Sequence, residues 1–211
     1  MEPPETVEPS QTVEPLRTRL VGGAPGAPLV PWARRRARRL SDLHGVFVDA
    51  AAHAQALRAG DPVVYETFEP PIPEAPGHLI CGVTVLHPGT VGAEFFMTRG
   101  HYHVHRQTAE VYHVLEGTGY LLLQREDGAA RAVPLAPGDL VYVPPGWGHR
   151  SVNTAATPLL LLYVFPGDAG HDYEAAQATG FRYTVVRTPT GPALIEPRTA
   201  PASGSGGRRD G

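Results

Sequence analysis

The sequence predicts an all-β domain, a double-sheet jelly roll or barrel, and three observations lead to this prediction. Short segments rich in Val, Leu, Tyr and Phe recur between about residues 62 and 187. Turn residues separate most of them, and the clearest turn is Asp127-Gly128, a dipeptide typical of tight hairpins. Proline is frequent at the strand boundaries, where it limits edge pairing. Short strands at this spacing are typical of two-layered or closed antiparallel sheets.

The expected strands follow one another along the middle of the chain. They cover residues 62–68, 79–87, 91–98, 110–115, 118–125, 131–135, 140–143, 149–154, 158–165 and 182–187. Two segments, Asp49 to Arg58 and Tyr173 to Ala178, predict a few short helices at the periphery of the barrel.

The two ends of the chain lack this pattern. Residues 1–27 are acidic and contain the tandem Thr6-Val7-Glu8-Pro9 and Thr12-Val13-Glu14-Pro15, which offers too little apolar surface to offset its ordering entropy. The tail, residues 199–211, is rich in Gly, Ser and Arg. We therefore expect disordered extensions at 1–27 and 199–211 around a single domain of residues 28–198.

Composition excludes several functions. The net charge of -3 and the charged fraction of 18% argue against a nucleic-acid surface. The first 20 residues contain no apolar stretch long enough for a signal peptide or a membrane span, so we expect no membrane partner. Cys81 is the only cysteine, which rules out an intrachain disulfide and predicts a reducing, cytoplasmic location.

One run of positive charge stands out before the first expected helix. It consists of Arg34, Arg35, Arg36, Arg38 and Arg39. The run precedes a helix or strand start at Leu40-Ser41-Asp42, so we interpret it as a solvated face or as intersubunit ion pairs.

Four potential metal ligands, His101, His103, Glu110 and His149, form a split constellation. Side chains at i and i+2 share one face of a strand, and Glu110 can reach the face of His101 and His103 after a short turn. Each histidine alone would more often be an ordinary polar strand residue. Together, three imidazoles and one carboxylate suit a divalent transition metal and leave positions for exchangeable ligands.

Two further histidines lie near this set. His105 falls on the same face as His103 and is a potential substitute ligand or base. His113 has the opposite parity from Glu110, so we expect it to face away.

The spacing of these residues matches a known pattern. Gly138, Pro144, Gly146, His149 and Asn153 fill every place in the second motif of the metal-binding cupins, which the chain resembles. The first motif departs from the general pattern. Six residues separate His103 from Glu110 where three or four are usual, and Phe95 stands where a glycine is expected.

With these departures, the chain resembles the cupin-type glucose-6-phosphate isomerases, which were first known from archaea. The resemblance rests on Thr98-Arg99-Gly100-His101-Tyr102-His103, Ala109-Glu110-Val111-Tyr112, Arg38-Arg39-Leu40-Ser41-Asp42, Phe47-Val48-Asp49, Asp61-Pro62-Val63-Val64-Tyr65-Glu66, Pro88-Gly89-Thr90-Val91-Gly92 and Asp168-Ala169-Gly170-His171-Asp172-Tyr173. It covers about residues 28–198 in order. The expected fold is therefore the cupin double-stranded β-helix.

The resemblance implies a metal-dependent isomerase that interconverts glucose 6-phosphate and fructose 6-phosphate in glycolysis or gluconeogenesis. It implies a cytoplasmic homodimer with one divalent ion per subunit. Iron(II) is the first expectation, and manganese, nickel, cobalt and zinc are alternatives because mixed nitrogen and oxygen donors accept all of them.

The resemblance also assigns roles at the site. Phosphate would be held by Thr84, Thr98 and the backbone of Gly100, where glycine allows close approach of the main chain. Tyr65 and Tyr112 match pocket tyrosines that could hydrogen-bond sugar hydroxyls.

Acid-base chemistry needs further groups. Glu110 is the candidate base between C1 and C2, unless it serves only as a metal ligand and the reaction proceeds by hydride shift. His171, with Tyr173 beside it, is the candidate for ring opening. Phe165 stands where relatives carry a tyrosine, so one hydroxyl contact is expected to be missing.

Two other functions compete with this one. The first is another metal-dependent cupin enzyme, either an oxygenase or decarboxylase or an isomerase of mannose 6-phosphate. The long spacing between His103 and Glu110 argues against the oxygenase. The second is a non-catalytic sugar-phosphate-binding cupin, which Phe165 and the extended termini suggest.

Overall fold

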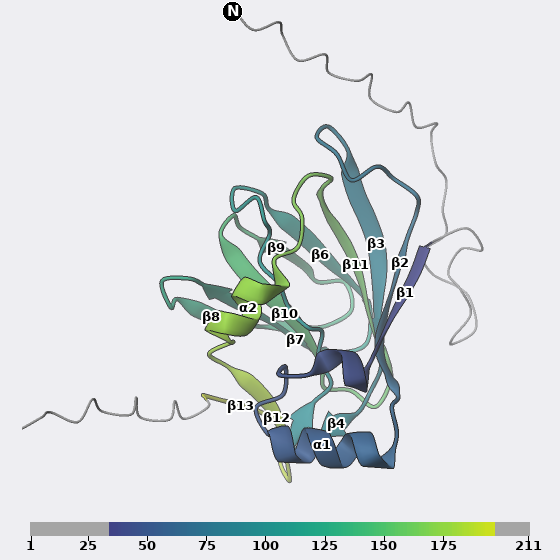
Figure 1. Cartoon of the computed structure of the whole chain (residues 1–211), viewed down its shortest axis with the longest axis vertical. Coiled ribbons are helices and arrows are strands. Elements are labelled where there is room, and N and C mark those ends of the chain that lie inside the picture. Colours follow the sequence, from purple (N-terminus) through teal and green to yellow (C-terminus); the bar gives the residue numbers. More distant parts are fainter. Residues whose placement is uncertain (1–33, 197–211) are drawn as a thin grey trace, which may run out of the picture.

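The strands of this computed structural model, which describes residues 34–196, form a double-stranded β-helix with short helices at its periphery (Figure 1). The all-β cupin fold predicted from the sequence is confirmed. No helix in the range 34–196 has the length and apolar character needed to span a membrane. The predictions for residues 1–27 and 199–211 lie outside the described residues.

Three antiparallel sheets build the domain. The six-stranded sheet has the order β1 (Arg34–Arg39), β2 (Val63–Glu69), β3 (Leu79–Leu86), β11 (Leu159–Pro166), β6 (Glu110–Glu116) and β9 (Leu140–Val143). The three-stranded sheet has the order β10 (Trp147–Asn153), β7 (Gly119–Arg125) and β8 (Ala130–Leu135). The four-stranded sheet has the order β13 (Gly191–Ile195), β12 (Thr184–Thr188), β5 (Glu94–Phe95) and β4 (Thr90–Val91).

The hairpin predicted at Asp127-Gly128 joins β7 to β8. Gly128 adopts a φ of 87°, which favours glycine, and the Asp127 carboxylate accepts a hydrogen bond of 3.0 Å from the backbone of Ala129. The turn therefore has the local chemistry that its sequence predicts.

The expected single strand at 91–98 is wrong. The chain reverses after Val91, where Gly92 has a φ of 55°, and β4 and β5 pair with each other as a short hairpin. The rest of the segment makes only isolated bridges, such as that between Met97 and Val152.

Two strands were not predicted. The hydrophilic β1 is one edge of the six-stranded sheet and pairs antiparallel with β2, whereas β13 returns beside β12. The strand or helix start expected at Leu40 is a 3-10 turn, Leu40–Leu43, that follows β1.

The arginine run makes ion pairs with carboxylates of its own chain. Arg35 pairs with Glu66, and Arg36 lies 3.5 Å from carboxylate oxygens of both Glu69 and Glu74. Arg35 and Arg36 therefore form ion pairs within the chain, and ion pairs of this run with a second subunit stay a prediction.

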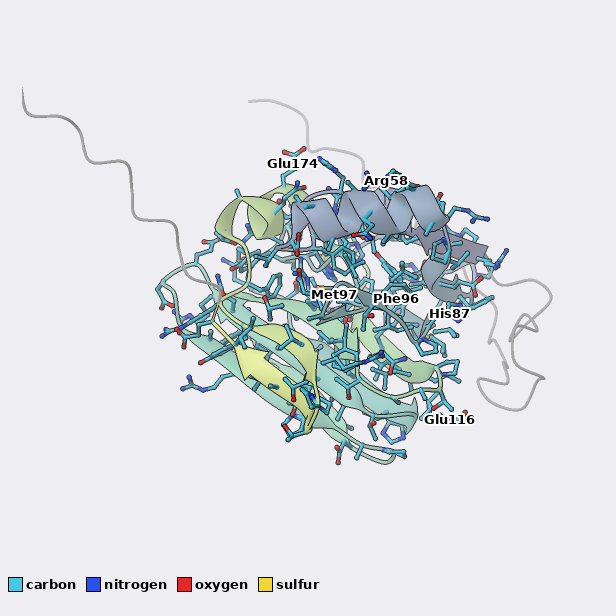
Figure 2. All side chains as sticks on the ribbon, turned by 90° about the horizontal axis from the view of Figure 1, so that it is seen from below. Arg58, His87, Phe96, Met97, Glu116 and Glu174 are labelled. Atoms are coloured by element: carbon cyan, nitrogen blue, oxygen red, sulfur yellow. The ribbon has the colours of Figure 1, made fainter. Side chains whose placement is uncertain are left out.

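Both predicted helices are present, as α1 (Ala50–Ala59) and α2 (Tyr173–Thr179). Aspartate caps each N-terminus, because Asp49 accepts from the backbone of Ala52 and Asp172 accepts from that of Ala175. Figure 2 shows the two helices on one side of the molecule, with Arg58 and Glu174 on their outer surface.

The core lies between the six-stranded and three-stranded sheets. Along β11 the side chains alternate, so that Leu159, Leu161, Tyr163 and Phe165 are buried while the residues between them are half-buried on the outer face. Leu159 and Leu161 fill one end of the interior. The two aromatic residues lie at the other end, where they line the pocket described next.

Candidate functional site

The four predicted metal ligands meet in the interior. His101 and His103 lie in the segment before β6, Glu110 begins β6, and His149 lies on β10. A backbone bridge between His101 and His149 brings the two halves of the set together. One ligand atom from each of the four residues lies within 4.8 Å of all the others.

The carboxylate of Glu110 is at the centre of this group. Its Oε2 lies 2.9 Å from Nε2 of His149, 3.1 Å from Nε2 of His103 and 4.0 Å from Nε2 of His101. Glu110 and His149 are each only 2% exposed. Such a set of nitrogen and oxygen donors in the interior is chemically suited to a divalent ion.

The orientation of the rings supports metal binding. Nε2 of His101 and Nε2 of His149 are buried and lack a hydrogen-bond partner among the described residues. The short distance from His149 to Glu110 has no hydrogen-bond geometry, so both atoms point toward a common centre. The other ring nitrogen of His103 lies 2.8 Å from the Thr108 hydroxyl, which leaves Nε2 for a ligand bond.

Electrostatics keep His101 and Glu110 in binding-competent protonation states. Burial, followed by the neighbouring His149, lowers the pKa of His101 well below its ordinary value, so the ring is neutral at pH 7. Burial alone would raise the pKa of Glu110, but the neighbouring His149 and the hydrogen bond with His103 outweigh it and keep the pKa well below its ordinary value. Glu110 is therefore an ionised carboxylate.

His171 lies directly beside the metal quartet. Its ring centroid is 4.4 Å from that of His101, and it stacks on Tyr173 at 5.8 Å with an interplanar angle of 9°. Burial lowers the pKa of His171. Asp172, between the two, exchanges backbone hydrogen bonds of 2.8 and 3.2 Å with Tyr102, which attaches the start of α2 to the metal-binding segment.

The predicted sugar- and phosphate-binding residues surround the same pocket, a cavity of about 90 Å³. Those that line it are Tyr65, Thr84, Thr98, Gly100, Tyr112 and Tyr173, together with His101, Glu110, His149 and His171. His103 completes the quartet from behind this lining. The structure thus brings the predicted site residues together.

The segment from Thr98 to Gly100 is held by Arg150. Its Nη2 donates to the carbonyl of Arg99 at 2.7 Å, and its guanidinium lies 4.4 Å over the ring of Phe181. The hydroxyl of Thr98 accepts from the backbone of Ser151 at 3.0 Å. Gly100 adopts a φ of 76°, so the turn into His101 requires glycine.

Several pocket residues were not predicted from the sequence. They are Arg36, Arg38, Thr67, Glu69, Ser151 and Tyr163. The hydroxyl of Tyr163 donates to the buried carboxylate of Glu69 at 2.7 Å, and its ring stacks on Phe165 at 5.8 Å. Tyr163 thereby brings a phenol to the neighbourhood of Phe165, where a missing hydroxyl was expected.

Strand parity carries a partial signal for three of these residues. Arg36 and Arg38 alternate along β1, and Tyr163 has the same parity as Phe165 on β11. Parity alone, however, does not tell which face of an unpredicted strand meets the pocket.

The remaining histidines lie outside the quartet. His105 is exposed and lies 3.5 Å from Asp168 rather than near the other ligands. His113 faces away from the pocket, as its parity predicts, and lies 3.1 Å from the carbonyl of Asp139.

Comparisons with known proteins agree with this site. A family model described as Glucose-6-phosphate isomerase (GPI) matches residues 37–195. The chain is 48% identical over 158 residues to a glucose-6-phosphate isomerase of Thermococcus onnurineus (strain NA1), covering 75% of this chain and 83% of that relative.

A bacterial relative and a solved structure extend the comparison. The chain is 39% identical over 182 residues to a glucose-6-phosphate isomerase of Sinorhizobium medicae (strain WSM419), covering 85% of this chain and 81% of the relative. An oxalate decarboxylase of Lactobacillus farciminis overlaps 52% of this chain and 30% of that chain at 19% identity, with a TM-score of 0.41. The family match and the sequence relatives, together with the metal quartet, show that this chain belongs to the glucose-6-phosphate isomerase family.

Proposed function

We propose that this protein interconverts glucose 6-phosphate and fructose 6-phosphate with the help of a divalent metal ion. The observation that carries the proposal is the convergence of the quartet, His171 and the phosphate-side threonines on one pocket in a member of this family. The quartet would hold the ion, which supplies a Lewis acid for oxygen atoms of the sugar. Iron(II) is the first candidate.

His171 is the proposed acid-base group for ring opening. Opening the ring requires that one proton leave the anomeric hydroxyl and that another reach the ring oxygen. A neutral imidazole can do both in turn, and burial keeps His171 neutral by lowering its pKa. Its stack on Tyr173 fixes the plane of the ring toward the quartet.

Glu110 is proposed as a metal ligand and as the candidate base between C1 and C2. The low pKa of its carboxylate supports the ligand role, because a weakly basic carboxylate is a poor proton acceptor at neutral pH. A hydride shift would need no base at carbon, only the transfer of a hydroxyl proton between O1 and O2. Isomerisation in D2O separates the two routes, since proton transfer through Glu110 incorporates solvent deuterium into the product and a hydride shift does not.

The phosphate group is proposed to bind at Thr84, Thr98 and Gly100, with Tyr65 and Tyr112 on the sugar hydroxyls. Burial raises the pKa of Tyr65 to about 12, so its hydroxyl stays protonated and can donate a hydrogen bond at any physiological pH. Burial likewise raises the pKa of Tyr112 well above its ordinary value.

The direct test is a coupled assay for glucose 6-phosphate formed from fructose 6-phosphate. The protein is stripped with a chelator and reloaded separately with iron(II), manganese, nickel, cobalt or zinc. Turnover that depends on the metal supports the proposal and ranks the ions. Absence of turnover in every metal form would refute the proposal. The activities to test would then be oxygen consumption, mannose 6-phosphate isomerisation, and sugar-phosphate binding without catalysis.

The protein is further proposed to act as a homodimer in the cytoplasm. The outer face of the six-stranded sheet is apolar over its central strands, with Val85, Leu160, Leu162 and Val164 half-buried there and Tyr142 exposed on β9. Pairing two such faces would bury this patch. Sedimentation of a monomer at micromolar concentration would contradict the dimer.

A further inference from the structure

Two arginines of β1 enter the wall of the active-site pocket. Arg36 and Arg38 are two residues apart, so they share one face of the strand, and both line the cavity. Arg35 lies on the opposite face, where it pairs with Glu66. Alternation along β1 therefore turns Arg36 and Arg38, but not Arg35, toward the pocket.

The strand register places Arg36 in the row of Thr84, which is proposed to bind phosphate, and Arg38 one inward-facing position farther along β1, beside Tyr65. Arg36 pairs with Thr67, which in turn pairs with Thr84 of β3. Arg38 pairs directly with Tyr65. Paired residues of neighbouring strands have Cβ atoms about 5 Å apart, so both guanidinium groups are within side-chain reach of these neighbours.

The same register separates this region from the metal quartet. Thr84 pairs with Leu161 on β11, and Leu161 pairs with Val114 on β6. Val114 is four residues beyond Glu110 along β6, which corresponds to about 13 Å along the strand. A sugar phosphate with its carbonyl end at the quartet thus directs its phosphate toward the rows that end at β1.

The two arginines differ in how their charge is neutralised. Arg36 is shared between Glu69 and Glu74, at 3.5 Å from each. Arg38 forms no ion pair within residues 34–196, and its one hydrogen bond goes to the carbonyl of Ala37 in its own strand, at 3.4 Å. Within the described part of the chain, Arg38 therefore brings to the pocket a positive charge that no carboxylate neutralises.

We propose that Arg38, assisted by Arg36, binds the phosphate group of the substrate and selects phosphorylated over neutral sugars. A guanidinium matches two phosphate oxygens with parallel N–H donors, which hydroxyls and a backbone amide cannot do. This inference deepens the proposed function and rests on it for the identity of the substrate.

The first experiment compares three variants of the metal-loaded enzyme with the unmodified protein, using fructose 6-phosphate. Arg38→Gln should raise KM about 10- to 100-fold, the range expected for one charge-assisted contact, while kcat changes much less. Arg38→Lys should give an intermediate KM because it keeps the charge but loses the fork. Raising the salt concentration should weaken kcat/KM less in Arg38→Gln than in the unmodified enzyme.

The matched control is Arg58→Gln. Arg58 is exposed on the outer surface of α1 and does not line the pocket (Figure 2). Arg58→Gln removes the same charge from the protein as Arg38→Gln, so a general electrostatic effect would appear equally in both variants. Arg58→Gln should leave KM and its salt dependence unchanged.

A second measurement keeps this inference separate from the proposed reaction. Inorganic phosphate is titrated calorimetrically into the metal-loaded protein and its variants. Weaker binding in Arg38→Gln than in Arg58→Gln supports the phosphate role even if the enzyme shows no turnover. The proposed role of Arg38 is overturned if Arg38→Gln and Arg58→Gln bind phosphate equally, or if they have an equal KM for fructose 6-phosphate.

Discussion

Gly148 allows two metal-binding segments to pack against each other. It precedes His149 on β10, and a Cβ atom at this position would lie 2.7–2.8 Å from three atoms of the Tyr102 ring. Tyr102 stands between His101 and His103 in sequence and is 1% exposed. Gly148→Ala therefore forces an overlap at the point where the halves of the quartet meet.

The structure offers little room to relieve this overlap. The backbone of Tyr102 is bound to Asp172 in both directions, and the guanidinium of Arg106 lies 5.0 Å over its ring. Overpacking of a filled interior costs about 1–3 kcal/mol, and a fixed ring favours the upper part of this range. For a domain of this size, about 2–3 kcal/mol lowers Tm by about 5–10 °C.

The assay is urea unfolding of the metal-free and metal-loaded forms, with Gly60→Ala as the control. A Cβ at Gly60, just after α1, meets no atom within 4 Å. Gly148→Ala should also weaken metal binding, because the shift of β10 moves His149 relative to His101. A loss of less than about 0.5 kcal/mol, the range of ordinary surface substitutions, would show that the Tyr102 ring yields freely and would refute the reasoning.

Three further outcomes follow from the site. Glu110→Gln should abolish the metal-dependent rise in stability. For the unmodified protein this rise is about 2.7 kcal/mol at a free metal concentration 100 times Kd. An equal thermal shift in the variant would contradict the role of Glu110 as a metal ligand. Tyr163→Phe should raise KM for fructose 6-phosphate about 3- to 10-fold, because it removes the hydroxyl that holds the Glu69 carboxylate in the pocket wall, whereas Tyr142→Phe on the exposed outer strand should not. The backbone of α2 and then Arg106 hold the pKa of Asp172 below its ordinary value. Its carboxylate therefore stabilises the fold above the unfolded pKa of about 3.9, and this contribution is lost as pH falls through the lower folded pKa. The free energy of unfolding between pH 7 and pH 3 should depend on pH less steeply in Asp172→Asn than in the unmodified protein.

The metal quartet and the two helices could be predicted because their signals are local. His101 and His103 share a face by parity alone, and the motif from Gly138 to Asn153 places His149 at a fixed spacing. Asp49 and Asp172 mark the helix starts through side chains that cap the backbone a few residues on. Such patterns depend little on distant parts of the chain.

The missed parts of the structure depend on distant partners. β1 is a strand because β2 offers it a free edge and the carboxylates of Glu66 and Glu69, and a run of arginines has no strand pattern of its own. The hydroxyl of Tyr163 reaches Glu69 only because Gly82, on the neighbouring strand, has no side chain in the way. Neither contact is visible before the strands are paired.

The burial of the pocket favours one orientation of the proposed substrate. Glu110 and His149 are each 2% exposed, whereas the Arg36 side chain is 44% exposed. A phosphate dianion at the buried end would lose its hydration and face the Glu110 carboxylate, which is costly for an unpaired charge. At the arginine end it would keep part of its hydration and meet the charge of Arg38, which no carboxylate within residues 34–196 neutralises. The proposed binding mode therefore has the neutral sugar, whose hydroxyls cost less to desolvate, enter first, with its carbonyl end at the quartet beside His171.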